Sequence, residues 1–174
     1  MKRLATLALL LAVPFTGCGK SSSKSADKKA AAATTTAAPR LVKADFIAKA
    51  DPICARVTSQ VNALPEPKSA TDLEPLVKKI VDIVKPALAD LRALNADPAD
   101  AAVFKEHFLD PNQAQLDAAE RFLADLPKAG GDEDKITARA EQWDKETSTI
   151  DDASDTHDAA LKTFGFNDCA KTNE

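Results

Sequence analysis

Apolar residues recur at intervals of three and four along residues 41–174, and charged or small polar residues fill the positions between them. This spacing places the apolar side chains on one face of a helix, and no stretch alternates with the period of two typical of a strand. Four such stripes follow one another along the chain. The first two are Phe46, Ala50, Ile53, Val57, Val61 and Leu64, then Leu73, Val77, Ile80, Val84, Leu88, Leu91 and Leu94. The last two are Phe104, Phe108, Leu116, Ala119, Leu123 and Leu126, then Ile136, Ala140, Trp143, Thr147, Ile150, Ser154, His157, Leu161 and Phe164.

Residues typical of helix ends separate the stripes and predict helices at about 44–64, 72–95, 98–128 and 136–164. The signals are the Leu64-Pro65-Glu66-Pro67 break, the capping-box spacing of Thr71 and Glu74, the Asp97-Pro98 start, the Gly130-Gly131 pair and a left-handed cap at Gly165. Short connectors place consecutive helices antiparallel. The sequence therefore predicts an all-α fold, an up-down antiparallel four-helix bundle with kinked or broken helices.

Pro52, Pro86 and Pro111 each fall near the middle of a predicted helix, where a proline removes a hydrogen bond and bends the chain. Alternatively, Asp51-Pro52 and Asp110-Pro111 are caps that start new helices, or the prolines are ordinary breaks. Antiparallel packing would bring three bends to a similar height and loosen the packing there. We therefore predict an apolar mid-bundle pocket, whose expected lining is Ile53, Val57, Val84, Leu88, Phe108, Trp143 and Ile150. The competing expectation is that these large side chains fill the space.

The N-terminal segment predicts export. Lys2 and Arg3 precede an apolar run of about a dozen residues, which is shorter than the ~20 that a membrane span needs and is typical of a signal peptide. The run ends at Phe15-Thr16-Gly17-Cys18, which resembles the lipobox of bacterial lipoproteins. That resemblance implies a signal peptide at 1–17, a diacylglyceryl group on the Cys18 thiol, and a location on the extracytoplasmic face of the bacterial cell envelope. The alternatives are ordinary secretory cleavage beside an unmodified cysteine, or an uncleaved anchor.

Residues 18–40 predict a flexible linker behind the lipidated cysteine, because after Cys18 they contain no aliphatic residue larger than alanine. Residues 1–40 carry seven Lys/Arg and one acidic residue, whereas 41–174 carry sixteen and twenty-six, so 16 − 26 gives the helical domain a net charge of −10. A basic linker favours anionic lipid headgroups. The acidic domain has no basic patch, and we expect no nucleic-acid partner.

The two remaining cysteines, Cys54 and Cys169, lie in the helical domain. Cysteines of exported proteins tend to pair, and a disulfide here requires the C-terminal tail to fold back over the helices. The alternative is two free thiols.

The motifs F-x-x-x-A-D-x-I-C at 46–54 and G-x-x-x-C at 165–169 resemble a set of small, uncharacterised helical lipoproteins of bacteria. That resemblance implies a helical fold with a terminal disulfide and implies no activity.

The sequence offers little chemistry. Its five glycines form no phosphate-binding loop, it has no G-x-S-x-G or H-E-x-x-H motif, and neither His107 nor His157 follows a glutamate at the spacing of di-iron bundles. We therefore expect no catalytic residue, cofactor or metal site. One alternative is a weak cation site, or a surface for a basic partner, on the acidic ridge beside His157, whose members are Asp144, Asp151, Asp155 and Asp158. The other is a solvated acidic face beside a hydrogen-bonded histidine.

The function predicted from these features is binding, to an unknown envelope protein or to a small apolar ligand, by a domain attached to the membrane through its N-terminus. The alternatives are an enzyme of unrecognised type and a passive envelope spacer.

Overall fold

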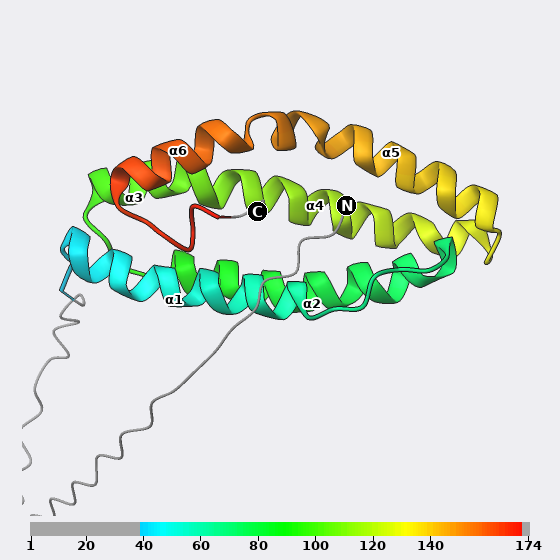
Figure 1. Ribbon diagram of the computed structural model, residues 1–174, viewed down its shortest axis with the longest axis horizontal. Coiled ribbons are helices and arrows are strands. Elements are labelled where there is room, and N and C mark those ends of the chain that lie inside the picture. The colour runs from blue at the N-terminus through cyan, green and yellow to red at the C-terminus, as the bar shows by residue number, and fades with distance from the viewer. Residues whose placement is uncertain (1–38, 172–174) are drawn as a thin grey trace, which may run out of the picture. The chain divides into compact units, whose positions relative to one another are not determined.

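The computed structural model describes residues 39–171, and this part of the chain is all-α, as predicted (Figure 1). Its helices are α1 (Lys43–Asn62), α2 (Leu73–Arg92), α3 (Pro98–Phe104), α4 (Asp110–Asp125), α5 (Glu133–Asp152) and α6 (Ser154–Phe164). Three shorter turns accompany them: the 3₁₀ turns η1 (Ala70–Asp72) and η3 (Leu126–Ala129), and the π-helical turn η2 (Lys105–Leu109). The described residues contain no strand, only an isolated parallel bridge between Leu41 and Ala96. None of these helices combines the length and apolar character that crossing a membrane requires.

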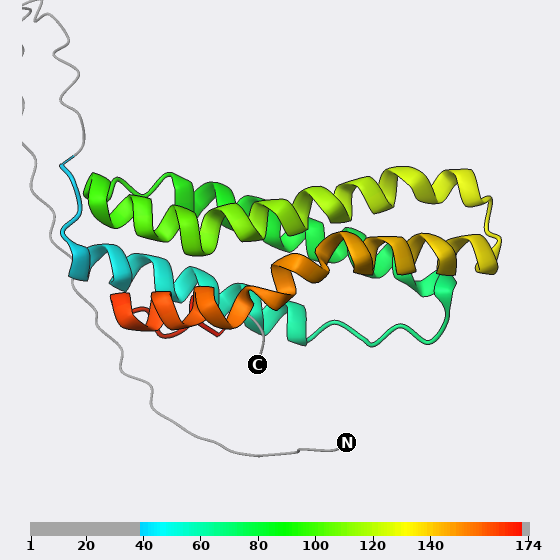
Figure 2. The same cartoon turned by 90° about the horizontal axis from the view of Figure 1, so that it is seen from above.

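The helices lie side by side along one long axis (Figure 1). α1 packs against α2, α2 against α4, and α4 against α5, while α6 packs against η2. α3, η2 and α4 form one nearly continuous rod, and α5 and α6 form another. α1 is shorter than these rods and ends near the middle of the domain, where an extended segment at 63–69 takes its place (Figure 2).

Most predicted helix ends are confirmed. Asp97 caps α3 by accepting a hydrogen bond from the Ala99 amide at 3.0 Å, and Gly165 ends α6 with φ of 117°. The prediction of a capping box at Thr71 and Glu74 is wrong, because the box forms two residues earlier. There, Ser69 and Asp72 exchange their side-chain and backbone hydrogen bonds, and the chain enters α2 through η1.

The central prolines behave differently from one another. α1 continues through Pro52 and α2 through Pro86, so no new helix starts at Asp51-Pro52. In contrast, Asp110-Pro111 does start a helix, because α4 begins there directly after the π-helical turn. Pro111 has no amide hydrogen to donate to the carbonyl of His107, which lies within that turn, and the predicted continuous helix at 98–128 is therefore divided.

The fourth predicted helix, at 136–164, is also divided, at Ala153. The cause lies in the local charges. Asp151 and Asp152 place negative charge at the C-terminal end of α5, where the helix dipole opposes it, and no basic residue lies in that last turn. In addition, Asp151 and Asp155 would repel each other at i, i+4 in an unbroken helix. After the break, Asp155 lies in the first turn of α6, where the dipole stabilises negative charge.

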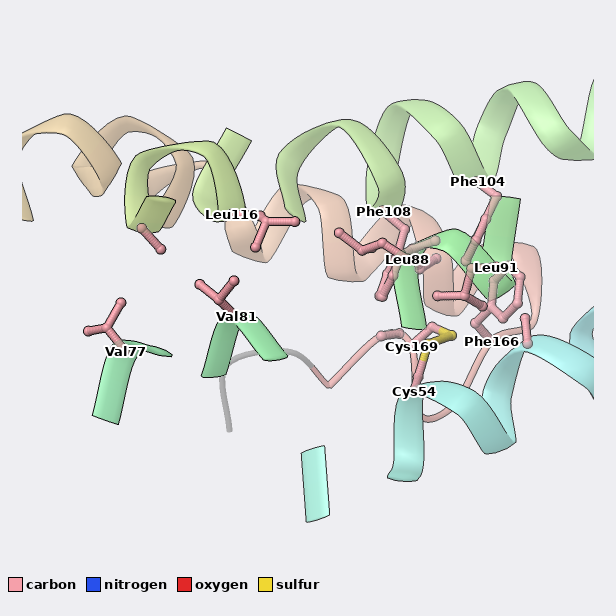
Figure 3. Packing of buried hydrophobic residues seen from close by; sticks show 14 of the residues in the cluster. Cys54, Val77, Val81, Leu88, Leu91, Phe104, Phe108, Leu116, Phe166 and Cys169 are labelled. Atoms are coloured by element: carbon pink, nitrogen blue, oxygen red, sulfur yellow. A yellow bond between two sulfur atoms is a disulfide. The ribbon is translucent and has the colours of Figure 1, made fainter. Parts of the chain in front are cut away.

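The core is densest around four phenylalanine rings. Phe104 packs against Phe46, Phe108 and Phe166, with ring centroids 5.2, 4.9 and 4.9 Å away, and all four side chains are buried. Figure 3 shows Phe104, Phe108 and Phe166 within this cluster. Phe166 belongs to the tail after α6, which folds back toward α1 (Figure 1). The tail therefore contributes a core residue rather than lying loosely over the helices.

Candidate functional site

The first hollow of the domain lies between α1, α2 and the rod formed by η2 and α4. Its volume is about 220 Å³, and its wall is mostly aliphatic. The lining residues are Cys54, Val57, Thr58, Val61, Asn62, Ile80, Val84, Ala87, Leu88, Leu91, Phe108, Asn112 and Gln115. Three helical segments therefore supply one apolar surface, on which Leu88 and Phe108 lie close together (Figure 3).

A second hollow, of about 290 Å³, lies on the other side of the same residues, between α2, α4 and α5. The two hollows share Ile80, Val84, Asn112 and Gln115. The rest of the second lining is Val81, Leu116, Ala119, Trp143, Thr147 and Asp151. We call these two spaces together the waist hollows. Each hollow is somewhat smaller than the ~300–1,000 Å³ that is typical of ligand sites.

The waist hollows form where two helices end. Val61 and Asn62, the last residues of α1, line the first hollow, and Asp151, in the last turn of α5, lines the second. Beyond this point α1 no longer covers α2 and α4 (Figure 2). The space thus arises because one helix stops and another breaks at nearly the same height.

A few polar groups face this apolar space. The side-chain amide of Asn112 donates a hydrogen bond to the Phe108 carbonyl at 2.9 Å, and that of Gln115 donates to Asp151 Oδ1 at 3.1 Å. No lysine or arginine of the described residues lines either waist hollow, and Asp151 is the single carboxylate that does. The lining therefore offers donors as well as acceptors, because each amide nitrogen keeps a second N–H and the indole nitrogen of Trp143 is buried without a hydrogen-bond partner.

Next to the waist hollows lies a pair of histidines. Nδ1 of His107, in η2, is 3.1 Å from Nδ1 of His157, in α6, so one ring donates and the other accepts a single proton. Both side chains are half-buried, and they border a small hollow of about 20 Å³ that also touches Asn112 and Gln115. The predicted hydrogen bond of His157 is present, and its partner is His107.

The acidic ridge does not form a metal site in this structure. Within residues 39–171, no group of three or more histidine, cysteine, aspartate or glutamate side chains is positioned to hold a metal ion. Asp144, Asp151 and Asp155 are exposed.

The predicted pocket residues separate into three groups. Val57, Val84, Leu88 and Phe108 line the first hollow together, Trp143 joins Val84 around the second, and Ile150 lies beside the histidine pair. Ile53, although half-buried, lines none of the three spaces. The sequence did not identify Asn112 and Gln115, which all three spaces share. Their signal was their position in the first turn after Pro111, on the face that also carries Phe108 and Leu116.

Cys54 connects the first hollow to the C-terminal tail. Its sulfur lies 2.06 Å from that of Cys169, at bonding distance, and both residues are buried (Figure 3). One turn earlier, the buried carboxylate of Asp51 accepts hydrogen bonds from three successive tail amides, those of Asn167, Asp168 and Cys169, at 3.0–3.1 Å. The tail is thus held against α1 beside one wall of the hollow. Cys18, the predicted lipidation site, lies outside the described residues.

Charged residues gather at the opposite end of the domain, away from the site. Arg139, of which only 11% of the side chain is exposed, contacts Asp125 at 3.0 Å and Glu146 at 3.4 Å. Hydrogen bonds from Lys128 and then Arg139 lower the pKa of the Asp125 carboxyl below its usual range. These contacts join α4 to α5 and contribute no group to the waist hollows.

No family model, no curated protein and no solved structure matches this chain. The resemblance to bacterial lipoproteins therefore stays a prediction from the sequence, and the functional argument rests on the waist hollows themselves.

Proposed function

We propose that the protein is a lipid-anchored, extracytoplasmic binding module that holds a small apolar ligand in its waist hollows, and that it is not an enzyme. The first hollow carries this proposal, because three helical segments contribute a mostly aliphatic wall with few polar groups. Ligand sites are typically concave, predominantly apolar and placed between helices in this way.

The fold in this proposal is an up-down antiparallel four-helix bundle. Its four members are α1, α2, the α3–η2–α4 rod and the α5–α6 rod. The packing of α1 on α2, α2 on α4 and α4 on α5 supports this arrangement, as do the short connectors between them. In such a bundle the early end of α1 leaves the interior uncovered at one height, which is where the waist hollows lie.

The anchor in this proposal is Cys18, which follows Thr16 and Gly17 at the end of the apolar run. A diacylglyceryl group supplies two hydrocarbon chains, and two chains hold a protein stably at a membrane where one holds it only marginally. We expect wild-type protein to fractionate with membranes and to show a lipid-modified Cys18 by mass spectrometry. The Cys18→Ser variant should be released or should retain its signal peptide, and an unmodified Cys18 thiol in the wild type would refute the anchor.

Ligand binding is tested with N-phenylnaphthylamine, an uncharged dye that fluoresces in apolar surroundings. We expect the dye to bind the full chain and expect Val84→Phe to weaken binding by about tenfold or more, because Val84 lines both waist hollows and the added ring fills them. Ile83→Phe is the matched control, since Ile83 is the half-buried neighbour on α2 and lines neither hollow. Equal weakening by both variants, or no binding by folded wild type, would contradict the proposal.

A further inference from the structure

The two histidines of the chain meet, although 50 positions separate them in the sequence. Nδ1 of His107, in η2, lies 3.1 Å from Nδ1 of His157, in α6, and the ring centroids are 5.4 Å apart. Because the centroids are much farther apart than the nitrogens, the rings meet end-on through this one contact. We propose that the histidine pair is an acid-sensitive contact, which holds α6 against η2 at neutral pH and opens when both rings are charged. This inference does not depend on the proposed ligand.

The number of protons on the pair decides whether the contact holds. When both rings are neutral, one Nδ1 donates and the other accepts. One added proton leaves an imidazolium that donates to a neutral imidazole, and such a charge-assisted hydrogen bond is stronger. A second added proton removes the acceptor, so that the N–H groups of two like charges face each other at 3.1 Å. The doubly charged pair must therefore separate.

The surroundings of the pair attract protons and stabilise the separated form. The small hollow beside it is bordered by neutral side chains, of which Asn112, Gln115 and Ser154 can accept a hydrogen bond from an imidazolium. None of the ionisable side chains within six residues of either histidine borders this hollow, and most of them are acidic. They are Lys105, Glu106, Asp110, Asp151, Asp152, Asp155, Asp158 and Lys162.

The first turns of α6 are placed to move when the pair separates. α6 meets α5 at the break at Ala153, so that no continuous helix has to bend. The other end of α6 is held by the tail, through Phe166 and the disulfide of Cys169 (Figure 1). Asn112 and Gln115 border the small hollow and also line both waist hollows, so acid loosens a wall that these spaces share.

Amide hydrogen exchange of the full-length protein, followed by NMR from about pH 8 to pH 5, tests this inference over the range in which imidazole gains its charge. Rates are corrected for the pH dependence of the chemical exchange step. We expect the protection of the amides at 155–158 to fall about tenfold or more in acid, because local opening exposes them. Phe164, at the end of the same helix that the tail holds, should change much less.

Three variants assign the effect to the pair. His107→Gln replaces one titrating ring by a neutral group that can still form a hydrogen bond, so protection at 155–158 should stay nearly constant over this range. His157→Gln should give the same result from the other side and decides the question if His107→Gln does not fold. Ser154→Ala, which borders the same hollow and leaves both rings in place, is the matched control and should keep the acid-dependent loss. An equal loss in wild type and the glutamine variants, or no loss in folded wild type, would overturn the inference.

Discussion

The two ends of the helical domain are stabilised by different interactions. At the disulfide end, formed by α1, α3, η2, α6 and the tail at 165–171, four buried phenylalanine rings share one core cluster with the Cys54–Cys169 pair. At the far end, formed by the start of α2, η3, the end of α4 and the start of α5, one aromatic stack of Phe122 on Trp143 lies beside ion pairs. Both ends bury apolar side chains, at the far end those of Val77, Phe122, Leu126 and Ile136, but the first adds a covalent bond and the second adds ion pairs.

The ion pairs of the far end hold it less firmly than the aromatic cluster holds the disulfide end. Glu146 reaches Arg139 at 3.4 Å and Arg121 at 3.5 Å, and buried nitrogen or oxygen atoms of Arg139, Trp143 and Glu146 have no hydrogen-bond partner. Solvent-exposed pairs contribute only ~0–1 kcal/mol, and a buried polar atom without a partner is destabilising. The comparison teaches that a covalent bond and an aromatic cluster reinforce the core on one side of the waist hollows, whereas ion pairs accompany the core on the other side.

The strongest test of this comparison removes the disulfide. The bond closes a loop with a sequence separation of 115 residues, worth roughly 4–5 kcal/mol of unfolding free energy in the chain-entropy model. We expect Cys169→Ser to lower the melting temperature by ~10–20 °C, measured by circular dichroism.

The double variant Cys54→Ser/Cys169→Ser should unfold at nearly the same temperature as Cys169→Ser alone, because both variants lose the same disulfide bond. Reduction of wild type should have a similar effect. Thiol labelling of both residues in native, unreduced protein would show instead that the bond does not form in solution.

The second test concerns the carboxylate that holds the tail. Asp51 is 9% exposed and accepts three amide hydrogen bonds, whereas an asparagine would turn a donating NH₂ group toward one or more of those amides. We expect Asp51→Asn to lower the unfolding free energy by about 2–3 kcal/mol, since hydrogen bonds to charged groups are the stronger class. Hydrogen exchange at Asn167, Asp168 and Cys169 should accelerate together. Asp82→Asn, at an exposed position of α2, is the control and should change stability by less than about 0.5 kcal/mol.

The sequence predicted the helices well because their signals are local. Periodic apolar residues, the Asp97 cap and Gly165 each act within one or two turns, and the structure places them as expected. The interruptions were harder to predict. The π-helical turn before Pro111 and the break at Ala153 also have local causes, the missing proline amide and the adjacent aspartates, but the apolar spacing alone does not show whether such a feature bends a helix or ends it.

The site was predicted only in part, for a similar reason. Apolar stripes identify inward-facing residues such as Val57, Val84 and Leu88, which do line the first hollow. The stripes do not show that α1 ends at nearly the same height as the break between α5 and α6. This coincidence leaves the waist hollows uncovered. They also give no register between helices, so the pairing of His107 with His157, and the shared position of Asn112 and Gln115, could not be predicted.

The third test compares the two aromatic regions directly with matched variants, Phe104→Leu and Phe122→Leu. The two side chains are equally buried, at 1% and 0% exposed, but Phe104 contacts three other rings and Phe122 one. Each aromatic pair adds about 0.5–1.5 kcal/mol beyond burial, and Phe104 has two more pairs than Phe122, so Phe104→Leu should cost about 1–3 kcal/mol more in chemical denaturation. Equal losses would mean that burial alone, rather than ring geometry, distinguishes the two ends.

The smallest expected effect is electrostatic and belongs to the far end. The hydrogen bond from Lys128, at 2.6 Å, and then that from Arg139, at 3.0 Å, lower the pKa of Asp125 in the folded protein. A carboxyl whose folded-state pKa is depressed stabilises the fold at pH values above its unfolded pKa. That contribution is lost as the pH falls through the folded pKa, from about pH 5 downward. Wild type should therefore be slightly more stable than Asp125→Asn at pH 7, and the difference should close in acid.

In a Lys128→Met background the main cause of the lowered pKa is absent, so the difference in stability between Asp125 and its asparagine variant should depend less on pH. A difference that stays constant between pH 7 and pH 3 would indicate that the Asp125 ion pairs do not contribute to the stability of the far end.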